Sequence, residues 1–167
     1  MSYRNKIYVC FDGDNDIHYY RLMKAWKRNN NTPFNFFDAH DLNTALDTSL
    51  ESTIKRRLRE RLTNSKVFIV LIGSQTRYLY RFVRWEMEQA INLSIPIIGI
   101  NLNGLRFQDS EKCPPLIRDC LAVYISFNVS IMQYAIDNWP NVHFSKLSQN
   151  DKGPCYYVDS VYNGLGL

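Results

Sequence analysis

The stretch KVFIVLIGSQT, at residues 66–76, decides the expected fold. Its first part is apolar at every position from Val67 to Ile72, and a strand that is apolar on both faces is typical of the centre of a parallel sheet. The turn residues Gly73-Ser74-Gln75-Thr76 then end the strand, and a helix is expected over about residues 81–93. A strand, a turn and a helix in this order predict a βαβ unit.

The same alternation extends in both directions from this stretch. Further strands are expected at residues 7–11, 34–37, 95–100 and 122–127. Further helices are expected at about 18–28, 50–62 and 131–139, with short turns at 115–119 and 157–162. Right-handed crossovers then give a flavodoxin-like α/β fold, in which a doubly wound parallel five-stranded sheet has the order 2-1-3-4-5.

Length and composition limit the class of protein. A chain of 167 residues fits one domain, with a core over about residues 5–140 and a C-terminal extension over about 141–167. Hydrophobic residues make up 46% and charged residues 22%, which excludes general disorder. No apolar run is long enough for a membrane span, and the start of the chain lacks the features of a signal peptide, so a cytoplasmic protein is expected.

The charge is uneven along the chain. Residues 1–84 hold 15 Lys and Arg against 8 Asp and Glu, whereas residues 85–167 hold 5 against 8. The densest basic stretch is residues 55–61, where the apolar positions recur every four residues. An amphipathic helix with its basic side in water is therefore favoured, and a nucleic-acid partner is not expected.

Cysteine and histidine spacing gives no support for a metal site. The four cysteines form no CxxC pair and are expected to be reduced thiols in or near the core. The three histidines make no HxxxH or HxxE spacing. No metal and no separate cofactor is predicted.

Ligands of a doubly wound sheet bind at the carboxyl ends of its strands, and this rule selects the loops at residues 12–16, 38–43 and 73–80. GxGxxG, Walker A and GxSxG motifs are all absent. The remaining candidate for a functional residue is Glu86, which lies about one turn into a helix and on the same side as Phe82. An aromatic ring beside a carboxylate can hold a flat heterocycle and place the acid against a sugar. The alternative is a carboxylate favoured there by the helix dipole.

At this point the residues resemble a known family. KVFIVLIGSQT, followed by RFVRWEMEQAI and IPIIGINLN, is similar to the TIR-like proteins of bacterial Thoeris anti-phage defence, the ThsB group. The first strand with its Asp-rich loop and the ending FFDAHD of the second strand agree with the same family. The resemblance covers about residues 7–103, and the C-terminal third matches in outline.

The resemblance implies an enzyme that cleaves NAD, as its substrate, at the nicotinamide–ribose bond. The product would be an ADP-ribose-derived nucleotide, cyclic or conjugated, which activates a partner effector protein. The catalytic glutamate of the family falls on Glu86, and Phe82 stands where the family has Trp, which keeps a stacking surface but loses the indole N–H. The other residues expected around the substrate are Phe11, Asp12, Asp38, His40, Ser74 and Trp85.

Two other functions stay open. A non-catalytic TIR-like interaction module would suit the Phe82 departure, and self-association into a homo-oligomer would accompany it. A nucleoside deoxyribosyltransferase-like enzyme would share the sheet and a catalytic glutamate. Release of free bases from deoxynucleosides would distinguish this third function from NAD cleavage.

Overall fold

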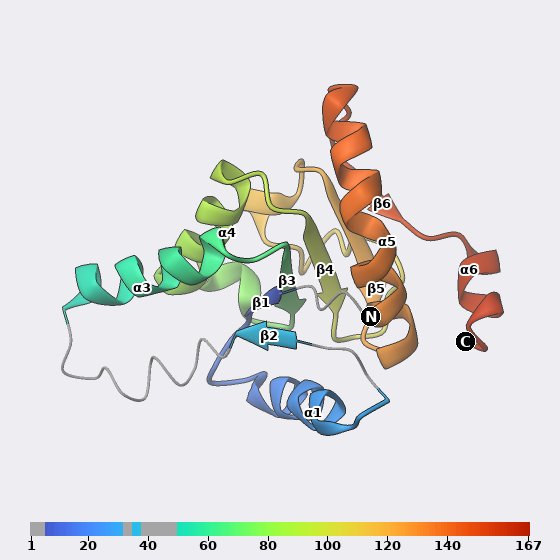
Figure 1. Ribbon diagram of the computed structural model, residues 1–167, viewed down its shortest axis with the longest axis horizontal. Helices are drawn as coiled ribbons and strands as arrows, with labels where there is room; N and C mark the ends of the chain where they lie inside the picture. Colours follow the sequence, from blue (N-terminus) through green and yellow to red (C-terminus); the bar gives the residue numbers. More distant parts are fainter. Residues whose placement is uncertain (1–5, 32–34, 38–49) are drawn as a thin grey trace.

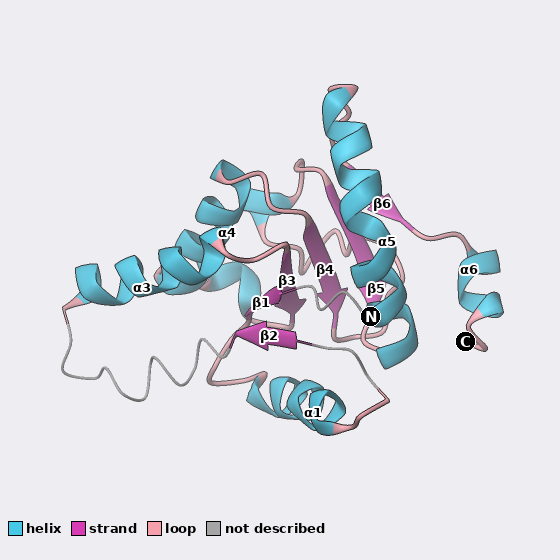
Figure 2. Ribbon diagram, in the orientation of Figure 1, coloured by secondary structure: helices cyan, strands magenta, loops and turns pink. Residues whose placement is uncertain are grey.

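The structure is a computed structural model, and it describes residues 6–31, 35–37 and 50–167. Its elements, in chain order, are β1 (Lys6–Cys10), α1 (Ile17–Arg28), β2 (Asn35–Phe37), α3 (Glu51–Thr63), β3 (Val67–Ile72), the 3-10 turn η1 (Thr76–Tyr78), α4 (Phe82–Asn92), β4 (Ile97–Asn101), the 3-10 turn η2 (Pro115–Ile117), β5 (Ala122–Ser126), α5 (Val129–Ser148), β6 (Pro154–Tyr156) and α6 (Asp159–Gly164). Figure 2 shows how strands and helices alternate along the chain.

All strands pair in parallel in one sheet, which runs β2-β1-β3-β4-β5-β6. The expected parallel α/β architecture is therefore confirmed. The prediction of five strands is wrong, because β6 adds a sixth strand beside β5. This strand has only three residues, and both Pro154 and Tyr156 are exposed, so it lacks the buried apolar run that marks the central strands.

Helices cover both faces of the sheet (Figure 1). On one face, α1, α5 and α6 pack on residues such as Val9 and Ile69. On the other face, α3, α4 and η2 pack on residues such as Tyr8 and Val70. Every side chain of β3 is buried, as expected for a strand between two helical layers.

Helix α3 shows how the sequence pattern produces this packing. Leu58 and Leu62 lie one turn apart and are fully buried against the sheet. The exposed side of the helix carries the arginines Arg56, Arg57 and Arg59. The prediction of a helix with its basic side in water is confirmed.

Helix α5 is much longer than predicted. It runs for 20 residues and continues through Pro140, whereas the expected helix ended at Trp139. Proline removes one backbone hydrogen bond and disfavours the helix interior. Trp139 and His143 are both buried, so burial on either side of Pro140 holds the helix together. Tertiary packing here outweighs the local preference.

Within the described residues, no helix combines the length and apolarity needed to cross a membrane. All four cysteines are free thiols, of which Cys10 and Cys113 are buried.

Candidate functional site

Glu86 is a carboxylate buried in the protein core. Helix α4 buries Met87 and Ala90 against the sheet, and this orientation also turns Glu86 inward, where the residue is only 6% exposed. Burial penalises the charged form and raises the pKa of Glu86 to about 7. A carboxyl with a pKa near neutrality can exchange its proton under physiological conditions, as acid–base groups of enzymes do.

The immediate neighbours of this carboxyl come from β1. The Cys10 thiol and the Tyr8 hydroxyl favour the charged form of Glu86, which offsets part of the effect of burial on its pKa. The thiol itself donates to the Val83 carbonyl at 3.9 Å. Burial and the nearby carboxylate raise the pKa of Tyr8 and of Cys10 well above their ordinary values, so both groups stay neutral. The Tyr8 hydroxyl has no fully formed hydrogen bond, although it is buried. It is therefore a donor available to the carboxyl.

Tyr8 and Cys10 were not among the predicted site residues. They occupy alternate positions of β1 and face the helical layer that contains α4. The Tyr8 ring stacks on Phe68 of β3, with 5.6 Å between ring centres and 11° between planes. In the sequence, these two residues are visible as a tyrosine hydroxyl and a cysteine thiol within an otherwise apolar strand. Only the alternation of side chains along β1 indicates that both lie on the face of the sheet next to Glu86.

The loop after β1 is organised by Asp12. Its carboxylate accepts hydrogen bonds from the backbone N–H groups of Asp14 and Asn15, at 3.0 and 3.3 Å, and from the side-chain amide of Asn15 at 2.7 Å. Asp12 is 2% exposed. Its oxygens hold the loop in shape, so the structure gives this predicted substrate-binding residue a positioning role in the loop.

Asp16 brings the loops after β1 and β3 together. One carboxylate oxygen of Asp16 is buried and has no hydrogen-bond partner, and burial and the charge of Asp12 raise the pKa of Asp16. A Cβ atom added at Gly73 would lie 2.3 Å from this oxygen. The glycine is needed because the two loops approach this closely. Asp16 was not predicted as a site residue.

The turn after β3 is closed by Thr76. The Gly73 N–H donates to the Thr76 hydroxyl at 2.9 Å, and that hydroxyl donates to the Leu71 carbonyl at 3.2 Å. Ser74, the residue predicted to contact substrate, lies at the exposed tip of this turn.

The two aromatic candidates on α4 lie in different surroundings. Phe82 opens the helix, is half-buried against the same core cluster as Tyr8, and has the Arg81 guanidinium 5.7 Å from its ring centre. Trp85 lies between α4 and α3, with Lys55 and Arg59 each 5.6 Å from its ring centre. Phe82 therefore fits a site around Glu86 better than Trp85 does.

Phe11 is not brought to Glu86. Phe11 stacks on Tyr20 at 4.4 Å between ring centres and belongs to the core cluster on the opposite face of the sheet. Asp38 and His40 lie outside the described residues. Phe11 is thus a core residue of the α1 layer.

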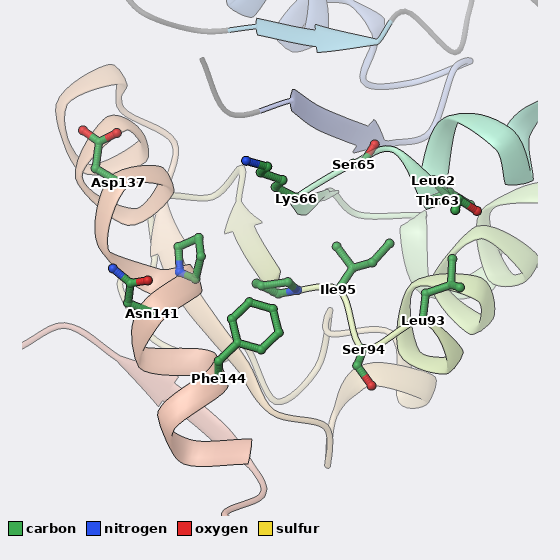
Figure 3. Close-up of a pocket in the computed structure, with 12 residues that line it drawn as sticks. Leu62, Thr63, Ser65, Lys66, Leu93, Ser94, Ile95, Asp137, Asn141 and Phe144 are labelled. Atoms are coloured by element: carbon green, nitrogen blue, oxygen red, sulfur yellow. The ribbon is translucent and has the colours of Figure 1, made fainter. Parts of the chain in front are cut away.

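A cavity of about 740 Å³ lies at the other end of the sheet from Glu86. Figure 3 shows Asp137, Asn141 and Phe144 of α5 on one side of it and Leu93, Ser94 and Ile95 on the other. Over the described ranges, no group of three or more His, Cys, Asp or Glu side chains is placed to hold a metal ion.

The parallel sheet with helices on both faces, and a buried carboxylate on α4 beside the carboxyl end of β1, define a TIR-like α/β domain. Residues 8–106 match the family model for "Thoeris protein ThsB, TIR-like domain". This match covers more than half of the chain and includes the last three residues of β1, all of β3 and α4, and Glu86. The chain belongs to this family.

A curated relative agrees with this assignment. Over 70 residues the chain is 40% identical to a protein of Bacillus cereus (strain MSX-D12) named "Putative cyclic ADP-D-ribose synthase ThsB1". The aligned segment is 42% of this chain and 35% of the Bacillus protein. The chain thus matches about a third of the length of that relative.

Proposed function

We propose that this protein cleaves NAD at the nicotinamide–ribose bond and converts the ADP-ribose part into a cyclic or conjugated signal nucleotide in anti-phage defence. The observation that carries the proposal is Glu86, a buried carboxyl of pKa about 7 on α4. Membership of the Thoeris ThsB family and the name of the Bacillus relative support it.

The chemistry needs a fixed negative charge near the ribose. When the glycosidic bond breaks, its electron pair goes to the pyridinium nitrogen, so nicotinamide leaves as a neutral molecule without being protonated. Positive charge then develops on the ribose, as in glycoside cleavage generally. The Glu86 carboxylate stabilises that charge, and the acceptor that attacks the ribose determines whether the product is cyclic, conjugated or hydrolysed.

The surroundings of Glu86 control its charge. Substrate binding places a cationic pyridinium near the carboxyl, and an opposite charge favours ionisation. Tyr8 and Cys10 favour the ionised form of the carboxyl. Phe82, half-buried at the start of α4, supplies an aromatic surface for a flat ring of the substrate.

Residues 1–167 form one TIR-like domain in this proposal, since β6, close to the C-terminus, pairs with β5 in the same sheet. NAD is the substrate, and a diffusible product carries the signal to an effector protein. Asp12, Asp38, His40, Ser74 and Trp85 are kept as proposed contacts or supports of the substrate.

A second candidate function is a non-catalytic interaction module. The burial of Glu86, at 6% exposure, favours it, because a catalytic carboxylate has to reach its substrate. A catalytic Glu86 requires the surrounding loops to open or its side chain to rotate when NAD binds.

The test uses cells that express the protein and are infected with phage. Mass spectrometry of small molecules should find an ADP-ribose-derived species with the wild type that is absent with Glu86→Gln, and its mass identifies the acceptor. If neither protein yields such a species although both are folded and abundant, the interaction module is the better account.

A further inference from the structure

A second cavity, of about 260 Å³, lies between α4 and η2. Its lining comes from the segment that joins η1 to α4, from the first two turns of α4, and from the residues at the start of η2. Figure 1 shows the segment around η2 beside α4. The residues around η2 lie outside residues 8–106 matched by the family model.

Most of the lining of this cavity is apolar. The apolar side chains are Leu79, Met87, Pro114, Pro115 and Leu116. Such a lining accommodates the carbon skeleton of a ligand, and the few polar groups of the cavity then determine which ligand is chosen.

Two arginines line the cavity, and both have N–H groups left for a ligand. Arg84 has a side chain that is 50% exposed, and its Nε donates to the Glu88 carboxylate at 3.2 Å. Arg77 donates from Nη1 to the Glu111 backbone carbonyl, and its guanidinium lies 5.3 Å from the Tyr78 ring centre. Each guanidinium is thus held by one hydrogen bond and keeps its other donors for an acceptor in the cavity.

The charge around this cavity is positive. Among the described residues, no Asp or Glu lines it. With the flanking residues included, the positive side chains are Arg77, Arg81, Arg84, Lys112 and Arg118, and the negative ones are Glu51, Glu88, Asp109 and Glu111. Three of these carboxylates already have partners, because Glu51 and Glu88 pair with arginines and Asp109 accepts two backbone N–H groups. An anion is therefore the favoured ligand.

We propose that this cavity binds a nucleoside monophosphate, with its phosphate on Arg77 and Arg84 and its base on Tyr80. Two guanidinium forks match the several oxygens and the double negative charge of a phosphate monoester better than the single charge of a carboxylate. Tyr80 lines the cavity and is 71% exposed, so its ring stands at the rim. A volume of about 260 Å³ is small for a whole nucleotide, which leaves the base at this rim to stack on the tyrosine.

This site is distinct from the surroundings of Glu86, although both include α4. Glu86 has Tyr8 and Cys10 of β1 as its neighbours. Met87, the next residue of the helix, lines the cavity on the side of η2. The proposal therefore goes beyond NAD cleavage and does not depend on it.

The test measures the binding of AMP, adenosine and ribose 5-phosphate to the purified full chain by calorimetry, without NAD. AMP should bind at least about tenfold more tightly than adenosine, because adenosine has no phosphate for the two arginines. Ribose 5-phosphate keeps the phosphate but lacks the base, so it should bind at least about fivefold more weakly than AMP.

Three variants at exposed side chains locate the site. Arg84→Gln should weaken AMP binding at least about tenfold, because it removes one guanidinium. Tyr80→Ala should weaken AMP binding at least about fivefold and leave ribose 5-phosphate binding unchanged, because only the stacking surface is lost. Arg28→Gln is the matched control, since it makes the same change of charge at the end of α1, and it should bind AMP as the wild type does.

Five results would overturn the proposal. AMP might show no saturable binding to the folded wild type, or adenosine could bind as tightly as AMP. Folded Arg84→Gln could keep the wild-type affinity for AMP. Phosphotyrosine could bind more tightly than AMP, which would assign the cavity to a phosphorylated side chain of another protein. Glu86→Gln could weaken AMP binding as much as Arg84→Gln does, which would place AMP beside Glu86. Because no turnover is measured, none of these results decides whether the protein cleaves NAD.

Discussion

The Tyr8 hydroxyl and the Glu86 carboxyl meet inside the core, between the first strand of the sheet and helix α4, and each changes the ionisation of the other. The Tyr8 hydroxyl lowers the pKa of Glu86, while burial and then the carboxylate charge raise the pKa of Tyr8. Burial outweighs the effects of Tyr8 and Cys10, so the pKa of Glu86 lies at about 7. The ionisation of the proposed catalytic group thus falls in the physiological pH range.

The first prediction concerns the pH dependence of NAD cleavage. Because the ionised carboxylate stabilises the positive ribose, kcat/KM should rise with pH and level off above a midpoint near 7. Initial rates of nicotinamide release between pH 5 and 9 measure this. A midpoint near the ordinary glutamate value of 4.5 would show that the catalytic carboxylate is not buried as described.

The second prediction separates Tyr8 from general effects of core substitution. Tyr8→Phe removes a hydroxyl that favours the charged carboxylate, so the pKa of Glu86 should rise and the midpoint of the pH profile should move to higher pH. Tyr20→Phe alters a buried tyrosine on the opposite face of the sheet and should leave the midpoint in place. Equal midpoints in all three proteins would remove Tyr8 from the site.

The third prediction is that Glu86 destabilises the fold at alkaline pH. Its pKa is raised from 4.5 to about 7 in the folded state, so the folded protein binds more protons than the unfolded chain between these values. The free energy of unfolding should therefore fall as pH rises through this window. At pH 8, Glu86→Gln should be more stable than the wild type by on the order of 3 kcal/mol.

Denaturant unfolding at pH 4 and pH 8 tests this stability difference. Glu88→Gln is the matched control, since Glu88 lies on the same helix and pairs with Arg84 at 3.2 Å on the exposed side. The loss of this ion pair should change the free energy of unfolding by no more than about 1 kcal/mol at either pH. If the difference in the free energy of unfolding between the wild type and Glu86→Gln were the same at both pH values, that result would contradict the raised pKa of Glu86.

The fourth prediction concerns the contact between the loops after β1 and β3. Gly73→Ala places a Cβ atom 2.3 Å from Asp16 and should destabilise the protein by about 1 to 3 kcal/mol. Gly164→Ala, where the added Cβ meets nothing within 4 Å, should be neutral or slightly stabilising. In a double-mutant cycle, Asp16→Ala should recover part of the loss at Gly73. Additive effects would mean that the two loops do not touch.

Most elements were predictable because their patterns are local. The apolar run of β3 and the four-residue repeat of aliphatic residues in α3 each identify one element without reference to the rest of the chain. The failures have non-local causes. Strand β6 is defined by its pairing with β5, and the second half of α5 depends on burial of His143 beyond Pro140.

The candidate site was predictable only in part for the same reason. Glu86 could be selected because its distance from the start of a helix is visible in the sequence. Tyr8, Cys10 and Asp16 could not, because parallel pairing of β1 with β3 brings them beside residues far away in the chain. Phe11 was selected from its place at the end of a strand, but alternation along β1 turns its side chain to the opposite face.

The most direct test of the central claim is nicotinamide release from isotope-labelled NAD in lysates of infected cells that contain wild type, Glu86→Gln or Glu88→Gln at equal levels. We expect release with the wild type and with Glu88→Gln, and at least about a hundredfold less with folded Glu86→Gln. Release by folded Glu86→Gln at the wild-type rate would contradict the assignment of Glu86 as the catalytic carboxylate.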